Sequence, residues 1–79
     1  MELVKGSIIK ETKRNDREEF KSTTANTVLL YEVKRVNPKT YTLKCIDGYM
    51  KGTECKIAKD FQEERTDVYG TVTKWEQVR

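Results

Sequence analysis

Residues 27–61 read TVLLYEVKRVNPKTYTLKCIDGYMKGTECKIAKDF, and this stretch decides the fold class of the chain. Three runs in which apolar and polar residues alternate are separated by two turn signals, at residues 37–40 and 47–52. Alternation gives each run one apolar face and one polar face, as a half-buried antiparallel sheet requires. Pro38 suits a tight turn because its ring already fixes φ at about −65°. The stretch therefore predicts a small all-β domain.

Five strands are expected along the chain. The first covers residues 3–10, with a bulge or close backbone approach at Gly6. The second covers residues 27–37, and a bulge at Lys34 and Arg35 would return Val36 to the core. The other three are centred on residues 41–45, 53–57 and 68–75. The apolar positions predict a core that contains Leu29, Tyr31, Val33, Leu43 and Ile57.

Two connections between the strands have a distinct composition. Residues 11–26 are polar and charged, and Phe20 is their one large apolar residue, so we expect a long loop there. Loops of more than about 12 residues in a compact domain are usually functional or disordered. Residues 58–61, just before the last part of the chain, predict a short turn of 3₁₀ helix that tucks Phe61 under the sheet.

The order of these elements resembles that of an SH3-like barrel with five antiparallel strands and a long charged loop after the first. The sequence segments 31–36 (YEVKRV), 39–43 (KTYTL) and 57–61 (IAKDF) are similar to those of small uncharacterised proteins of bacteriophages and mobile elements. This resemblance implies a virus-encoded accessory role and assigns no functional residues. A five-stranded OB barrel is the alternative, but that fold usually has a helix between strands three and four, where this chain has a short turn.

Length and composition limit what the chain can do. Its 79 residues predict one domain, residues 1–79, with a thin core and no room for a deep pocket, which counts against an enzyme. The 16 basic and 13 acidic residues nearly balance, so charge permits nucleic-acid binding without demanding it. There is no histidine, the commonest general base and metal ligand. Neither a membrane span nor a signal peptide is visible, so we expect the cytoplasm of a host cell.

The two cysteines, Cys45 and Cys55, lie symmetrically about Met50, which would place them opposite each other across a hairpin. Two thiols without histidine cannot close a zinc site, and no base is available to activate a catalytic thiol. We expect both to be reduced and buried as small apolar side chains, with a disulfide as the alternative. No pair of carboxylates and no phosphate-binding glycine pattern indicates catalysis, a metal or a cofactor.

The candidate binding residues are cations and exposed aromatics. Lys10 and the loop cations would lie beside the bulge and the following turn in an SH3-like barrel, where they could converge on an anionic partner. An ordinary solvated surface is the alternative. The predicted contacts are Lys13, Arg14, Arg17, Lys34, Arg35, Lys39, Tyr49, Tyr69 and Trp75.

The sequence predicts a non-enzymatic binding module, most simply a phage protein that inhibits a host enzyme or defence system by binding to it. The first alternative is a nucleic-acid-binding barrel, whose affinity would fall steeply with salt. The second is a homo-oligomer that sequesters an anionic nucleotide. Trp75 is equally compatible with a lid on the core and with a contact to a partner.

Overall fold

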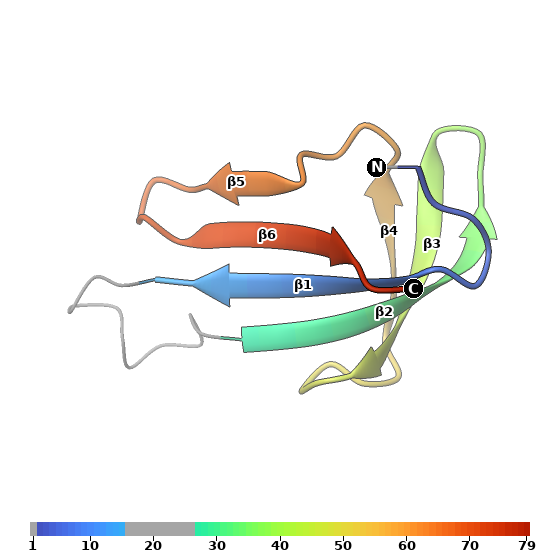
Figure 1. Ribbon diagram of the computed structural model, residues 1–79, viewed down its shortest axis with the longest axis horizontal. Coiled ribbons are helices and arrows are strands. Elements are labelled where there is room, and N and C mark those ends of the chain that lie inside the picture. Colours follow the sequence, from blue (N-terminus) through green and yellow to red (C-terminus); the bar gives the residue numbers. More distant parts are fainter. Residues whose placement is uncertain (1, 16–26) are drawn as a thin grey trace.

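The computed structural model describes residues 2–15 and 27–79, which form a curled, antiparallel half-barrel (Figure 1). The strands are β1 (Ile8–Arg14), β2 (Thr27–Val36), β3 (Thr40–Asp47), β4 (Glu54–Ala58), β5 (Glu64–Thr66) and β6 (Val72–Gln77). Their order in the sheet is β4-β3-β2-β1-β6-β5, and no helix occurs in this part of the chain. The all-β class is confirmed.

The chain builds the sheet in two pieces that meet at β1. Strands β1 to β4 follow one another as neighbours, and the chain then returns so that β6 pairs with the free side of β1. β3 and β4 run across the direction of β1 and β6 in Figure 1. β2 makes the bend, because its register with β3 shifts between Leu30 and Tyr31 and again between Val33 and Arg35. The bulge predicted at Lys34 and Arg35 is therefore confirmed.

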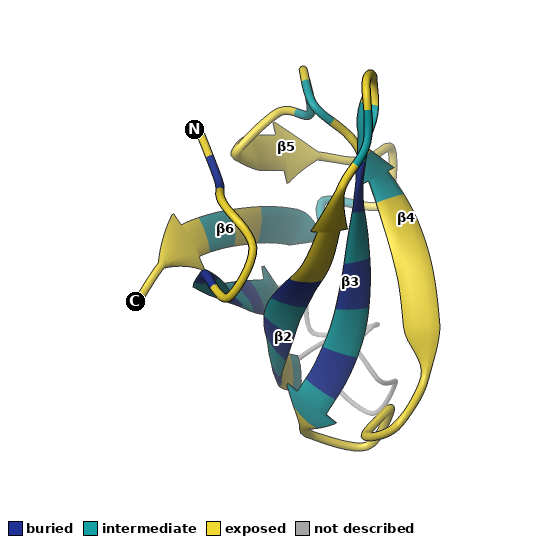
Figure 2. Cartoon of the chain, turned by 90° about the vertical axis from the view of Figure 1, so that its right-hand side faces the viewer, coloured by how far each residue is buried: buried dark blue, intermediate teal, exposed yellow. Residues whose placement is uncertain are grey.

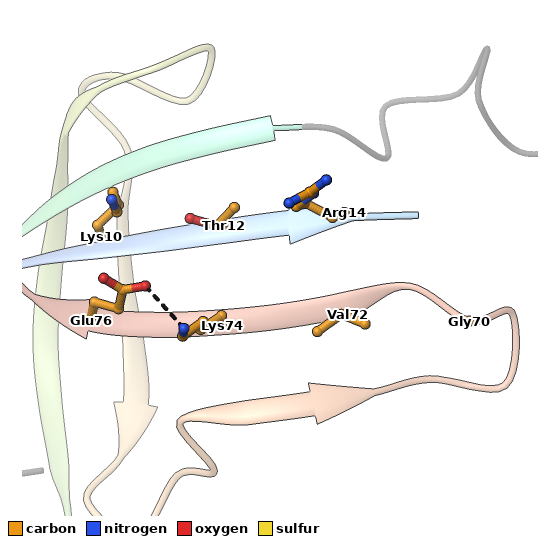
Figure 3. A pocket seen from close by; sticks show the side chains of 7 residues that line it. All are labelled: Lys10, Thr12, Arg14, Gly70, Val72, Lys74 and Glu76. Carbon is orange, nitrogen blue, oxygen red and sulfur yellow. Dashed lines mark ion pairs between the residues drawn. The ribbon is translucent and has the colours of Figure 1, made fainter. Parts of the chain in front are cut away.

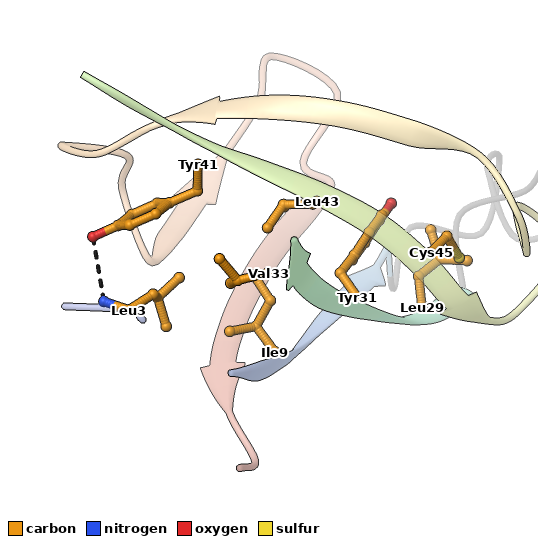
Figure 4. Packing of buried hydrophobic residues seen from close by; sticks show 8 residues of the cluster. All are labelled: Leu3, Ile9, Leu29, Tyr31, Val33, Tyr41, Leu43 and Cys45. Carbon is orange, nitrogen blue, oxygen red and sulfur yellow. Dashed lines mark hydrogen bonds between the residues drawn. The ribbon is translucent and has the colours of Figure 1, made fainter. Parts of the chain in front are cut away.

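The core lies on the inner face of the bend, mainly between β2 and β3 (Figure 2). Figure 4 shows its eight buried apolar side chains, which are Leu3, Ile9, Leu29, Tyr31, Val33, Tyr41, Leu43 and Cys45. Four of the five predicted core residues are among them, and Ile57 packs against the cluster while partly buried. The N-terminal segment is fastened to this core because the Leu3 amide donates a hydrogen bond of 3.2 Å to the Tyr41 hydroxyl. Val36 remains 44% exposed, so the bulge does not return it to the core.

The first strand differs from its expected position. It covers Ile8–Arg14 rather than residues 3–10, because the chain turns at Gly6, whose φ of 92° favours glycine. The polar residues that follow Lys10 still form a strand, since β1 is central and hydrogen-bonds to β2 on one side and β6 on the other. The predicted loop therefore loses its first residues to β1, and residues 16–26 lie outside the described part of the structure.

The C-terminal part contains two strands where one was expected. The Asp67 carboxylate accepts hydrogen bonds from the amides of Tyr69 (2.9 Å) and Thr71 (3.0 Å), and this turn interrupts residues 68–75. β5 precedes the turn and β6 follows it, so residues 2–15 and 27–79 contain six strands where five were predicted for the chain. The expected 3₁₀ turn is a single hydrogen-bonded turn, in which the Phe61 amide donates to the Ala58 carbonyl at 3.1 Å.

One charged side chain is buried with the apolar ones. Glu11 is only 9% exposed, and burial raises the pKa of its carboxyl above the ordinary value of 4.5, while the charge of Lys13 acts in the opposite direction. The folded protein therefore holds the Glu11 proton at a pH where the unfolded chain has released it. Stability consequently falls as pH rises through this window.

Replacing Leu43, which is fully buried, by alanine should reduce the free energy of unfolding by about 2–5 kcal/mol, because a cavity remains. Urea denaturation measures this loss. Val28→Ala is the control, since Val28 is 57% exposed and should change stability by less than about 0.5 kcal/mol. Equal effects of the two variants would show that the inner face has been assigned wrongly.

The Glu11→Gln variant should melt at a higher temperature than the wild type at neutral pH, because it removes a buried carboxylate. The difference should become small well below pH 4.5, where the carboxyl is protonated in both the folded and the unfolded chain. Thermal unfolding at several pH values measures it, with the exposed Glu76→Gln as the control. A lower melting temperature of Glu11→Gln at neutral pH would contradict the prediction.

Candidate anion-binding face

The outer face of β1 and β6 carries a shallow hollow of about 700 Å³ (Figure 3). Residues of β1 alternate across the sheet, so Ile9, Glu11 and Lys13 face inward while their neighbours face outward. The outward side chains of both strands and the β5–β6 turn line the hollow. They are Lys10, Thr12, Arg14, Gly70, Val72, Lys74 and Glu76.

Three cations in this hollow form a staggered row along the strands. Lys74 of β6 lies opposite Thr12 of β1, and so it falls between Lys10 and Arg14 along the strand direction. Each step along the row corresponds to two residues of a strand, or about 7 Å. The row is visible in Figure 3, where Arg14 lies at the end nearest the β5–β6 turn.

One carboxylate opposes this row. Glu76 lies opposite Lys10 in the β1–β6 register and forms an ion pair of 3.5 Å with Lys74. Both partners of the pair are about half exposed, so the pair is weak and can be exchanged for another anion. The described residues that line the hollow thus include three cations and one carboxylate.

An exposed aromatic residue stands at the end of the row. Tyr69 is 60% exposed in the β5–β6 turn, and Asn15, at the end of β1, holds this turn in place. Asn15 is 2% exposed, and its side-chain amide donates 3.0 Å hydrogen bonds to the Tyr69 carbonyl and the Thr71 hydroxyl. The turn is thereby fixed to the strand end that carries Arg14.

The structure brings together only part of the predicted binding set. Arg14 lies at the end of the basic row beside the turn that carries Tyr69, but Lys13 faces the inside of the half-barrel. Arg17 lies outside the described residues. Sequence reasoning missed Lys74, which lies 60 residues beyond Arg14 and reaches this face only because β6 pairs with β1.

The remaining predicted cations lie at the other end of the sheet, so the expected convergence is wrong. β1 and β2 are antiparallel, and Lys13 therefore lies opposite Thr27 at the start of β2. Lys34 and Arg35 are near the end of β2, and Lys39 is in the following turn. Lys34 there forms an ion pair of 3.2 Å with Glu32.

Of the other two predicted aromatics, Tyr49 is exposed as expected, whereas Trp75 packs against the core, which was one of its two expected positions. Trp75 packs inside the half-barrel, with its ring centre 5.6 Å from that of Tyr31 and 5.8 Å from that of Phe61. Tyr69 is in a turn and therefore does not lie on one strand with Trp75, although residues 68–75 were expected to form a single strand. Tyr49 is 67% exposed in the turn between β3 and β4.

The cysteines are not opposite each other. Cys55 lies opposite Leu43, and the Cys45 amide instead donates to the Thr53 carbonyl at 2.9 Å. Both thiols are free; Cys45 is 1% exposed, whereas Cys55 is exposed on edge strand β4, so the expected burial is wrong for Cys55. Partial burial of its thiol, followed by the nearby charges of Glu11 and Cys45, raises the pKa of Cys55.

Comparisons with family models, curated proteins and solved structures gave no match to this chain. Within residues 2–15 and 27–79, no cluster of three or more acidic or cysteine side chains could hold a metal ion. The same residues contain no helix that is long and apolar enough to cross a membrane.

A thiol reagent should modify the native protein in two phases. Cys55 should react first, more slowly than free cysteine near pH 8 because its raised pKa leaves less thiolate, and Cys45 should react only as the protein opens. Absorbance of the released reporter measures both phases. Cys55→Ser should remove the fast phase alone; two fast phases in the wild type would contradict the burial of Cys45.

Proposed function

We propose that this chain is a non-enzymatic binding module that holds an extended single-stranded nucleic acid on the outer face of β1 and β6. The observation that supports this proposal is the staggered row of Lys10, Lys74 and Arg14. The row ends beside the turn that carries the exposed Tyr69. Cations that follow a backbone, together with an aromatic ring on which a base can stack, are the usual elements of single-strand binding.

The shape of the face favours a single strand over the other expected partners. The hollow is shallow and lies on a sheet surface, so it would leave much of a mononucleotide in contact with water. A regular spacing of about 7 Å between cations instead suits successive phosphates of an extended strand.

The role of a phage-encoded inhibitor of a host enzyme or defence system is the second candidate. It is favoured by the exposed apolar side chains of the β3–β4 turn, where Tyr49 is 67% and Met50 is 38% exposed. Aromatic residues and methionine are enriched at protein interfaces. A pull-down from host lysate with and without nuclease separates the two candidates, because only the nucleic-acid candidate loses its partner to nuclease.

We also propose that the fold of this domain is SH3-like. It is supported by the strongly bent antiparallel sheet and by the return of the C-terminal strand to β1. The cytoplasm of the host cell is the compartment in which either partner would be met.

Binding of a labelled oligothymidylate of about a dozen nucleotides should weaken with salt, with a slope of about −2 in log K against log salt for three cations. Fluorescence anisotropy between roughly 50 and 200 mM salt measures it. The Lys10→Gln/Lys74→Gln variant should bind at least tenfold more weakly and reduce the slope by about 1.4. Glu76→Gln should bind more tightly, because it removes the carboxylate that competes for both lysines.

Lys39→Gln is the matched control, because it removes one positive charge at the opposite end of the sheet and should leave binding nearly unchanged. If Lys39→Gln weakens binding as much as Lys10→Gln does, affinity comes from net charge and the β1–β6 face is not the site. Absence of binding to the oligonucleotide at the lowest salt would reject the proposed function.

A further inference from the structure

A second concave region lies inside the half-barrel, on the opposite side of β1 and β6 from the basic row. It is a cleft of about 440 Å³ at the gap between the unpaired edges of β4 and β5. Glu11 comes from β1, Trp75 from β6 and Phe61 from the turn after β4. The cleft shares no lining residue with the outer hollow.

Glu11 is the unusual member of this cleft. Only 9% of its surface is exposed, yet its carboxylate forms no hydrogen bond or ion pair with any other described residue. All fully buried side-chain oxygen and nitrogen atoms of the described residues have hydrogen-bond partners. The oxygens of Glu11 must therefore reach the open space of the cleft. A buried carboxylate left without a partner costs stability, and such a cost is typical of a binding site.

The walls of the cleft define the kind of partner that this carboxylate fits. The rings of Trp75 and Phe61 pack edge to face, with centres 5.8 Å apart, and both are only partly buried. Aromatic rings of this kind attract organic cations and cover aliphatic chains. A metal ion is a poor fit, because no group of three possible ligands occurs in the described residues.

We propose that this cleft binds an alkyl chain that ends in an ammonium or guanidinium group, such as the side chain of lysine or arginine. The cationic end pairs with the Glu11 carboxylate, and the aliphatic stem lies against Trp75 and Phe61 at the mouth. Lys13 and Arg65 also line the cleft, but neither forms an ion pair with Glu11. Their positive charges would attract the carboxylate of a free amino acid.

Lys13 would compete with such a ligand for the Glu11 carboxylate. It lies two residues after Glu11 on the same face of β1, and its charge already favours the ionised form of Glu11. Removing the positive charge of Lys13 should therefore strengthen binding of an external cation. If Glu11 instead serves only to hold Lys13 in place, the same change should weaken the fold and create no binding.

The test uses n-butylammonium as the probe, n-butanol as its neutral control and the fluorescence of Trp75, which is the only tryptophan of the chain. At constant ionic strength, n-butylammonium should bind with a Kd on the order of 1 mM, at least tenfold more tightly than n-butanol. Glu11→Gln should reduce the affinity for the cation to that for the alcohol, whereas Lys13→Gln should increase it several-fold.

Two further ligands identify the source of the cation. Free lysine should bind more tightly than N-acetyl-lysine amide if the site takes a free amino acid, and equally well if it takes a side chain of a peptide. Equal responses to n-butylammonium and n-butanol, or unchanged binding by Glu11→Gln, would overturn the proposal. Lys10→Gln/Lys74→Gln should leave these titrations unchanged, so failure of either site is recognised independently of the other.

Discussion

The rest of the structure depends on the pairing of β1 on both of its sides. Its antiparallel register with β2 connects it to the first part of the chain, and its register with β6 connects it to the last. Without this strand the β2–β3–β4 meander and the β5–β6 hairpin would share no hydrogen-bonded edge. Ile9, near the start of β1, is fully buried and gives the two pieces a common core.

The sheet bends without closing into a barrel, and the opening determines how far the residues of its inner face are buried. β4 and β5 are its edges, and no ladder joins them in the described residues. The unclosed gap leaves Trp75 and Phe61 only partly buried and gives Glu11 access to an open cleft. A carboxylate in such a place is unfavourable for folding, and it breaks the rule that buried charges are paired. Positions of this kind are where function, rather than stability, explains the residue.

Alternation and turn chemistry made the middle of the fold predictable. β2 and β3 follow the apolar pattern closely, and the turn after Asp47 uses a glycine at φ 114°. A side chain at Gly48 would collide with Leu29, so that turn requires glycine for steric reasons as well. Residues 11–14 were not recognisable as a strand because their polarity is typical of a loop. Only pairing with β2 and β6, which is a property of the tertiary structure, makes them one.

The candidate site was less predictable than the fold for the same reason. The resemblance to an SH3-like barrel suggested that the cations of the first loop would meet those at the end of β2 and in the turn after it. Antiparallel pairing of β1 with β2 instead places the two groups at opposite ends. Lys74 joins Lys10 and Arg14 through a register between strands that are about 60 residues apart in sequence. The prediction from cysteine spacing was wrong for a similar reason. The register of β3 with β4 places Leu43, rather than Cys45, opposite Cys55.

The strict alternation of β1 has a consequence for how this chain can change during evolution. Substitutions on its outward positions can alter the surface charge while Ile9 keeps its place in the core. Inserting or deleting one residue within β1 would instead exchange its two faces, exposing the apolar side chain and burying lysines. This strand should therefore tolerate many replacements of side chains but almost no change in length.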